Sequence, residues 1–232
     1  MFTFLRLLHQ VFVIKSKTMK SLALSILFFS VFITGKSNFE NVIPKTYNFD
    51  QKITMTAKSS DEDAVDIDYF FSSKDDSILC MRMNADLEMG SSESIYIVFE
   101  NDKIEMLMNA AGMKMRKTIT KEEFSAFSNL DEIPEQSEIT KTGNSKIILG
   151  YTCNAYKTTT ESGSVTAWVC PNFPIDRAFV PMLGMRKNNP FDGFVMELHT
   201  TASTEKANLK ITNVDLNATL VLDTSTYKDF KF

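Results

Sequence analysis

Residues 65–83 read Val-Asp-Ile-Asp-Tyr-Phe-Phe-Ser-Ser-Lys-Asp-Asp-Ser-Ile-Leu-Cys-Met-Arg-Met, and they carry the clearest structural signal in the chain. Apolar residues alternate with polar ones on both sides of a polar turn around Asp75. An alternation with a period of two residues is typical of a β-strand that buries one face. The stretch therefore predicts a β-hairpin, with strands at residues 65–72 and 79–83.

The same alternation recurs from residue 47 to residue 222 and is the dominant pattern of the chain. Asn101 and Asp102 have the residue types of a turn, and Gly112 breaks another apolar run. Further strands are predicted at residues 47–56, 95–99, 104–108, 113–116, 146–156, 165–170, 194–200, 209–216 and 218–222.

One short helix is predicted at residues 120–130. Thr120 and Glu123 have the spacing of a capping box, and Phe124 and Phe127 follow about one turn apart. With about ten strands and one short helix, the sequence predicts an all-β domain built on a curved antiparallel sheet or open half-barrel.

The first 37 residues have the pattern of an export signal. After Met19 and Lys20, residues 21–33 form an uncharged, largely apolar run of 13 residues, shorter than the roughly 20 that a membrane-spanning helix needs. A basic start, an apolar middle and a small residue at Ser37 are typical of a secretory signal; the alternative is an anchor helix that is never removed. We therefore expect residues 1–37 to be a signal peptide with an upstream extension, its true start at Met19, and residues 38–232 to form a single β-rich domain.

No cysteine follows the apolar run at a position suited to lipid attachment. The mature form is therefore expected to be soluble, neither lipid-anchored nor membrane-spanning, and to lie in the periplasm or outside the cell.

The charge balance argues against nucleic acid as a partner. The chain has 25 Lys and Arg residues against 29 Asp and Glu, and five of the bases precede Glu40, which is the first acid. The mature domain thus carries about 20 bases against 29 acids. Nucleic-acid binding favours basic surfaces, so this acidic domain is expected to bind none.

Methionine is unusually frequent, with 13 residues, and three pairs have the spacing Met-x-Met. On a strand, both members of such a pair lie on one face. Three interpretations remain open: a Cu(I) site, the lining of an apolar cavity, and ordinary core packing. Copper is the weakest, because His199 is the only histidine of the mature chain and no histidine or cysteine lies within the pairs. The pairs are Met81 and Met83, Met106 and Met108, and Met113 and Met115.

The three cysteines divide into a pair and a single residue. If the hairpin turn is centred between Glu161 and Ser162, Cys153 and Cys170 face each other within disulfide reach. An exported protein meets oxidising conditions, so a Cys153–Cys170 disulfide is predicted; a register change of one residue would separate the two. Cys80 is left over, and we interpret it as a small buried residue; the alternative is a reactive thiol.

Enzyme and metal motifs are missing. A Ser-His-Asp or Cys-His hydrolase would require His199, which is expected to face solvent because it is out of phase with Met196 and Leu198, and no G-x-S-x-G motif accompanies it. Residues 61–68 are acidic but lack the spacing and glycine of a calcium loop. The sequence therefore predicts no enzyme activity, no bound metal and no cofactor.

Residues 179–185, Phe-Val-Pro-Met-Leu-Gly-Met, are apolar without alternation and lie between Pro174 and Pro190. Prolines and glycine resist regular structure, so the segment is interpreted as a loop. It is either a lid over the open side of the barrel or a buried connecting turn.

The stretch 141–156 combines Lys-Thr-Gly with Ile-Leu-Gly-Tyr-Thr-Cys and a final tyrosine, Tyr156. This pattern resembles the signature of a bacterial family of unknown function, domain family 4412. Residues 167–169 and 174–176 resemble the tryptophan strand and the segment that follow in that family. The resemblance implies an exported protein with an open, lipoprotein-carrier-like β half-barrel wrapped around a helix, and it brings no established activity.

Together these patterns predict an exported protein that binds or carries a hydrophobic ligand, such as a lipid, an acyl chain or a lipoprotein, in the concave face of the half-barrel. The alternative is an envelope or extracellular module that contacts a partner protein through its acidic outer face. The candidate ligand-binding residues are Met81, Met83, Met106, Met108, Met113, Met115, Phe127, Phe179, Met182 and Leu183.

Overall fold

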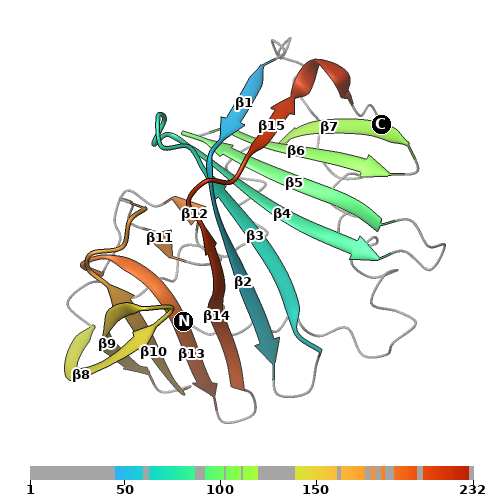
Figure 1. Ribbon diagram of the computed structural model, residues 1–232. Helices are drawn as coiled ribbons and strands as arrows, with labels where there is room; N and C mark the ends of the chain where they lie inside the picture. The colour runs from blue at the N-terminus through green and yellow to red at the C-terminus, as the bar shows by residue number, and fades with distance from the viewer. Residues whose placement is uncertain are drawn as a thin grey trace.

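The computed structural model describes residues 45–59, 63–86, 92–101, 103–110, 112–119, 139–160, 163–175, 179–180, 184–185, 191–202 and 206–229. These residues are nearly all β-structure (Figure 1). The elements are β1 (Thr46–Phe49), β2 (Gln51–Ser59), β3 (Val65–Phe71), β4 (Ile78–Asp86), β5 (Ser92–Glu100), β6 (Lys103–Ala110), β7 (Met113–Ile119), β8 (Thr140–Ile148), β9 (Tyr151–Thr160), β10 (Gly163–Cys170), β11 (Phe179–Val180), β12 (Gly184–Met185), β13 (Phe194–Ala202), β14 (Lys206–Asp215), β15 (Leu220–Asp223), the 3-10 helix η3 (Thr224–Thr226) and β16 (Lys228–Asp229).

Twelve of the described strands form one large sheet in the order β16-β7-β6-β5-β4-β3-β2-β14-β13-β10-β9-β8. All neighbours are antiparallel except β16, which pairs with β7 in parallel. Strands β1 and β15 form a separate two-stranded sheet, and β11 and β12 form another. The predicted all-β fold with a curved antiparallel sheet is confirmed; the predicted helix at residues 120–130 lies outside the described residues.

The hairpins predicted from alternation are confirmed. In the first, Phe71 pairs with Leu79 across the β3–β4 turn. The β5–β6 turn begins at Asn101, which adopts φ 52°, and the β6–β7 turn contains Gly112 at φ 79°. Asparagine and glycine tolerate this left-handed backbone better than other residues, which is why these turn signals could be read from the sequence.

The prediction of one strand at residues 47–56 is wrong, because the chain changes layer at Asp50. The Asp50 amide donates to the Phe71 carbonyl at 3.0 Å, and its carboxylate accepts from the Ser73 amide at 2.7 Å. Tyr47 then belongs to β1 in the small sheet, whereas Ile53 belongs to β2 in the large one. A single aspartate held by the β3–β4 turn therefore divides one apparent strand into two.

The prediction of one strand at residues 146–156 is also wrong. Ile148 pairs with Tyr151 across a two-residue turn, in which Leu149 has φ 49° and Gly150 has φ 86°. Positive φ at both central residues is the signature of a type I′ hairpin turn. Gly150 does mark a bend, as a glycine in a strand indicates, but the bend is a complete reversal of the chain.

The apolar segment at residues 179–185 was predicted to lack regular structure, and this too is corrected. Phe179 pairs with Met185 and Val180 with Gly184, so the described ends of the segment form two short antiparallel strands. Among the described residues, no helix has the length and apolar character that crossing a membrane requires.

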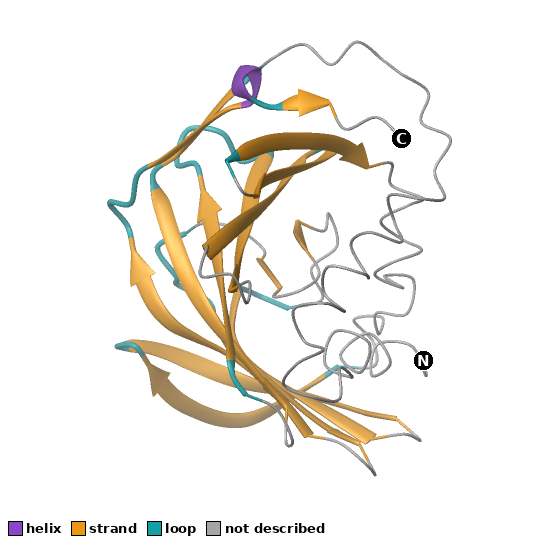
Figure 2. Cartoon of the chain, turned by 90° about the vertical axis from the view of Figure 1, so that its right-hand side faces the viewer, coloured by secondary structure: helices purple, strands orange, loops and turns teal. Residues whose placement is uncertain are grey.

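The large sheet bends so strongly that two parts of one face pack against each other (Figure 2). Strands β3 and β13 are separated by two strands, which would place them about 14 Å apart in a flat sheet. Yet the ring centroids of Phe71 and Phe194 lie 6.2 Å apart. This concave side is called the inner face below, and the opposite side, which packs against β1 and β15, the outer face.

Candidate functional site

The predicted methionines share the inner face of strands β4 to β7. The strand register aligns Met81 with Ile97 and Met106 in one row, and Met83 with Ile95, Met108 and Met115 in the next. Tyr69 pairs with Met81 and lies on the same face as Phe71, which identifies this face as the inner one. The name methionine face is used below for Met81, Met83, Met106, Met108 and Met115.

The methionine face is only partly buried. Met106 is 4% exposed and packs with Ile95 and Ile97, whereas the other four methionines are half-buried. Met113 pairs with Ala110 at the end of the β6–β7 hairpin and is 60% exposed, so it lies at the margin of the site. The structure thus places five of the six predicted strand methionines together on one face, and the sixth, Met113, lies at its margin.

The other predicted ligand residues are less well placed by the structure. The backbone of Phe179 lies in β11, paired with Met185. Phe127, Met182 and Leu183 lie outside the described residues.

The outer face is already covered. Strands β1 and β15 pack on it through an aromatic and aliphatic cluster that includes Tyr47, Phe49, Leu107 and Leu222. The rings of Tyr47 and Phe49 are stacked with centroids 6.4 Å apart. Within the described residues, this two-stranded layer lies on the outer face, opposite the methionines.

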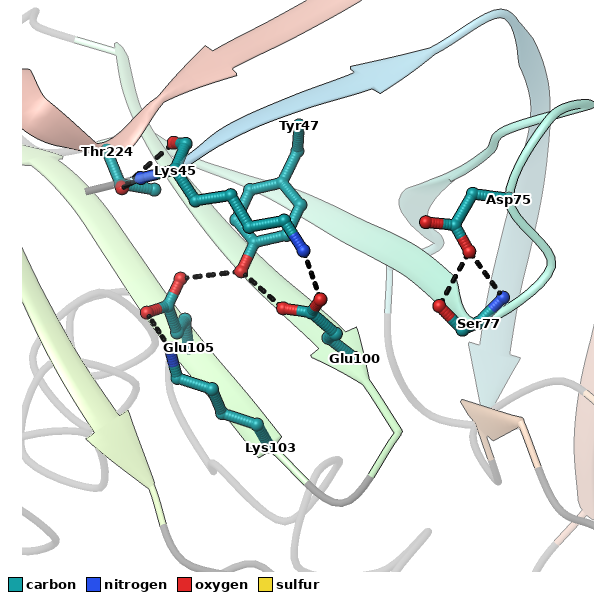
Figure 3. A network of polar contacts seen from close by, with 8 residues as sticks. All are labelled: Lys45, Tyr47, Asp75, Ser77, Glu100, Lys103, Glu105 and Thr224. Atoms are coloured by element: carbon teal, nitrogen blue, oxygen red, sulfur yellow. Dashed lines mark hydrogen bonds and ion pairs between the residues drawn. The ribbon is translucent and has the colours of Figure 1, made fainter. Parts of the chain in front are cut away.

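A polar network fastens β1 to strands β5 and β6 (Figure 3). The Tyr47 hydroxyl lies 3.0 Å from carboxylate oxygens of both Glu100 and Glu105. Lys103 lies 2.8 Å from Glu105, and Lys45 pairs with Glu100. Burial, reinforced by the Glu105 carboxylate, raises the pKa of the Tyr47 hydroxyl, so the phenol stays protonated and donates to the carboxylates.

Thr224, the first residue of η3, also binds the residue that precedes β1. The Thr224 hydroxyl accepts from the Lys45 amide at 2.8 Å and donates to the Lys45 carbonyl at 2.9 Å. Asp75 accepts from the Ser77 amide at 3.0 Å in the β3–β4 turn, which lies beside the network in Figure 3. The two Lys45–Thr224 bonds tie the start of β1 to the end of β15.

A second polar cluster was missed by the sequence analysis. Glu197 on β13 has a side chain that is 6% exposed, and Lys146 Nζ lies 2.8 Å from its Oε2. The same ammonium group lies 4.1 Å from the centroid of the Trp168 ring, and His199 pairs with the other carboxylate oxygen. His199, predicted to face solvent, is thus 41% exposed at its side chain and held by a buried glutamate.

The strand register explains why Glu197 was missed. Trp168 pairs with Glu197 and Val169 with Val195, so Met196 is an extra residue in a β-bulge. Residues 194–198 are all buried, so the strand does not alternate here and periodicity gives no sign that residue 197 is buried. The only signal in the sequence was Trp168, which pairs with Glu197 on the neighbouring strand β13.

The acidic run considered for calcium is engaged in protein contacts. Asp68 pairs with Arg82 and accepts from the Thr54 hydroxyl at 2.7 Å, and Asp66 accepts from Thr56 at 2.6 Å. Residues 61 and 62 lie outside the described part of the chain. Asp66 and Asp68 therefore stabilise strand pairing.

The cysteine register is as predicted. Val169 pairs with Asn154 in antiparallel strands. Cys170, which follows Val169, is therefore opposed to Cys153, which precedes Asn154. The structure has both as free thiols, and so the disulfide stays a prediction. Burial raises the pKa of Cys153 to about 12, with Cys170 adding to the shift, and burial also raises the pKa of Cys170. Cys80 is buried, as predicted, in the outer-face cluster with Phe70.

The fold and the site define a class of protein: a strongly curved, open antiparallel sheet with a methionine-rich inner face and a layered outer face. The chain belongs to the DUF4412 family, whose model, described as "Domain of unknown function (DUF4412)", matches residues 49–202. The resemblance found in residues 141–156 is therefore confirmed. No curated relative matches the chain.

Solved structures resemble the chain only distantly. PNGF-II has a TM-score of 0.40 at 10% identity over 78% of this chain and 30% of its own, so the chain spans under a third of that protein. LprF from Mycobacterium bovis has a TM-score of 0.38 at 9% identity over 73% of this chain and 87% of its own. A LolA superfamily protein from Nitrosomonas europaea has 0.29 at 11% identity over 89% of this chain and 97% of its own. Structural similarity at these TM-scores and identities does not indicate a function for this chain.

Proposed function

We propose that this protein is an exported binding protein, and not an enzyme, that holds a hydrophobic ligand on its methionine face. The ligand class is a lipid, an acyl chain or the acyl part of a lipoprotein. The observation that carries the proposal is the row of half-buried methionines on the inner face, next to buried isoleucines.

The physical argument concerns apolar area that folding leaves in contact with water. Burying such area contributes about 25 cal/mol per Å². Four methionines of the methionine face keep part of their side chains exposed, so a ligand that covers them gains this free energy without rearranging the core.

Methionine suits a ligand whose shape varies. Its side chain is unbranched and flexible, and its sulfur is polarisable, so a methionine surface adapts to different apolar partners. Leu79 and Ile104, in the adjacent row of the same face, are fully or nearly fully buried and provide a fixed flank beside the adaptable surface. The arrangement favours acyl chains over a single rigid ligand.

The outer face supports the choice of the inner one. Tyr47 and its two glutamates hold β1 against the outer face, where Phe49 and Leu222 are buried. A ligand on that side would have to displace a packed and hydrogen-bonded layer. The inner face is proposed as the binding surface because its methionines are already partly accessible.

The experiment is a titration with a fluorescent probe, a dansyl-labelled long-chain fatty acid. The test variant is Met83→Gln with Met108→Gln, which keeps side-chain length but adds polar atoms to the methionine face. The matched control is Met113→Gln, because that side chain is 60% exposed at the margin. The double variant is expected to bind the probe about tenfold more weakly or worse, and the control to bind like the wild type.

The proposal fails if the wild type shows no saturable binding, or if the double variant and the control bind equally well. Circular dichroism and thermal unfolding of each variant establish that the comparison is made between folded proteins. Mass measurement of the exported protein also tests the predicted signal, which gives a chain starting close to residue 38.

A second candidate is a module that contacts a partner protein, and one observation favours it. The β8–β9 hairpin lies at an edge of the large sheet, with Ile147 73% exposed and Leu149 45% exposed. Exposed apolar side chains at a sheet edge are typical of protein contacts. If the protein has this second function, the double variant Ile147→Lys, Leu149→Lys is expected to lose a co-purifying envelope protein. Its binding of the fatty-acid probe is expected to be unchanged.

A further inference from the structure

Cys153 and Cys170 lie on adjacent strands of one hairpin. The register that pairs Val169 with Asn154 opposes the two cysteines at the next position, and each thiol contributes to the pKa shift of the other. Opposed residues of antiparallel strands have Cα atoms about 4.5–5.5 Å apart. Disulfides join Cα atoms about 4.4–6.8 Å apart, so the strand spacing fits a bridge.

The geometry points to Cys153 and Cys170 as a cross-strand disulfide that staples β9 to β10. This modification is independent of ligand binding on the methionine face. It requires an oxidant, which is a small-molecule disulfide such as oxidised glutathione or an equivalent protein disulfide.

The reaction is two successive thiol–disulfide exchanges. One cysteine thiolate attacks the S–S bond of the oxidant, and one half of the oxidant leaves as a thiol. The second cysteine attacks the mixed disulfide and displaces the other half. The protein loses two thiol hydrogens, and the oxidant is reduced to two thiols.

Burial determines when this reaction takes place. The attacking species is a thiolate, and the pKa of Cys153 near 12 leaves very little thiolate in the folded protein at neutral pH. Cys153 and Cys170 are 0% and 2% exposed, so an oxidant also has little access after folding. The staple therefore forms while the hairpin is still open, during folding, and is then shielded from reductants.

Cys80 provides the matched control. It is equally buried, but it lies on β4 in the outer-face cluster, and its thiol contacts the Met81 carbonyl at 3.8 Å. A bridge to Cys80 is not expected. Cys80→Ala is expected to leave the staple intact, whereas Cys170→Ser abolishes it.

The test uses the full chain with its native sequence, refolded with oxidised glutathione, and then compared with protein purified from the host. A non-reducing peptide map is expected to show Cys153 linked to Cys170, with the intact mass lower by two hydrogens. Protein that is reduced in denaturant and refolded without oxidant is expected to have a Tm about 6–12 °C lower than the bridged protein, from the entropy of a loop of this length. Cys80→Ala retains this shift. Folded protein in the reduced form is expected to resist both alkylation and oxidation.

Two outcomes overturn the inference. One is that both cysteines are alkylated in unfolded samples of the refolded and the host-purified protein, which means that no bridge formed. The other is a bridge that includes Cys80. Both measurements use the native sequence and do not depend on the folding of a variant.

Discussion

The inner face of the sheet differs between its two ends. Where β3 approaches β13, Phe71 and Phe194 are fully buried, and the Phe173 ring packs at a tilt against Phe194 with ring centroids 4.2 Å apart. On strands β4 to β7, the same face carries methionines, four of them half-buried. Aromatic rings in fixed contact close one end, whereas flexible thioethers leave the other adaptable. One continuous face of the sheet thus combines a closed core with a partly accessible apolar surface.

The sharpest way to break this comparison is to truncate one side chain at each end. Phe71→Ala is expected to cost about 3–5 kcal/mol of unfolding free energy, because it opens a cavity among packed rings. Met108→Ala is expected to cost about 1 kcal/mol or less, because its side chain is already partly solvated. Urea unfolding of both variants measures the difference. Equal losses would mean that the methionine face is packed core.

A second test concerns the backbone of the closed end. A Cβ on Gly193 would lie 2.4 Å from the Cys170 carbonyl oxygen, and the residue has φ 140°. Gly193→Ala is therefore expected to cost about 1–3 kcal/mol. Gly112→Ala, in the β6–β7 turn, meets no atom within 4 Å and carries only the strain of its positive φ. Thermal unfolding is expected to rank Gly193→Ala as clearly the less stable; a reversed ranking contradicts the tight packing of this end.

The contribution of the outer face to stability can be distinguished from that of the inner face by its dependence on pH. Because the pKa of Tyr47 is raised above its ordinary value of 10.0, the unfolded chain loses this proton first as pH rises. The stability contributed by Tyr47 is thus fully present below pH 10 and is lost at higher pH. Tyr47→Phe is expected to cost about 1 kcal/mol at neutral pH, since its bonds to Glu100 and Glu105 are lost.

The measurement is urea unfolding of the wild type and Tyr47→Phe at about pH 8 and about pH 11, on either side of the ordinary tyrosine pKa. The gap between the two proteins is expected to narrow at the higher pH. A gap that stays constant would show that the Tyr47 proton is not held by the fold.

The smallest expected effect sharpens the role of methionine itself. Met83→Leu with Met108→Leu keeps apolar area but replaces flexible side chains by branched ones. Stability is expected to change by less than about 1.5 kcal/mol. Binding of the dansyl fatty acid is expected to persist, with a narrower range of accepted chain lengths. A total loss of binding, or an unaltered range, would show that flexibility is not what the methionines contribute.

Much of the fold could be predicted from local patterns. The hairpins at Asn101 and Gly112 follow from alternation and turn residues, and the facing positions of Cys153 and Cys170 follow from one assumed turn centre. The positions of the methionines also follow, since spacing by two fixes a common face. Which face it is depends on the curvature of the sheet, which no local pattern specifies.

Two of the errors share one cause, which is long-range contact, and the third is a local turn. Asp50 ends β1 because the β3–β4 turn binds its amide and carboxylate. Leu149 continues the apolar pattern, yet it adopts the positive φ of a tight turn. Glu197 is buried because Lys146 and Trp168 arrive from other strands. A sequence pattern describes a residue and its neighbours along the chain, whereas Asp50 and Glu197 are determined by partners from elsewhere.

The most direct test of ligand binding on the methionine face is native mass spectrometry of the protein purified gently from its own host, compared with the denatured sample. The account predicts a discrete extra mass in the native spectrum that disappears on denaturation and is strongly reduced in the Met83→Gln, Met108→Gln variant. A native mass without ligand, together with no binding of the dansyl fatty acid, would contradict it.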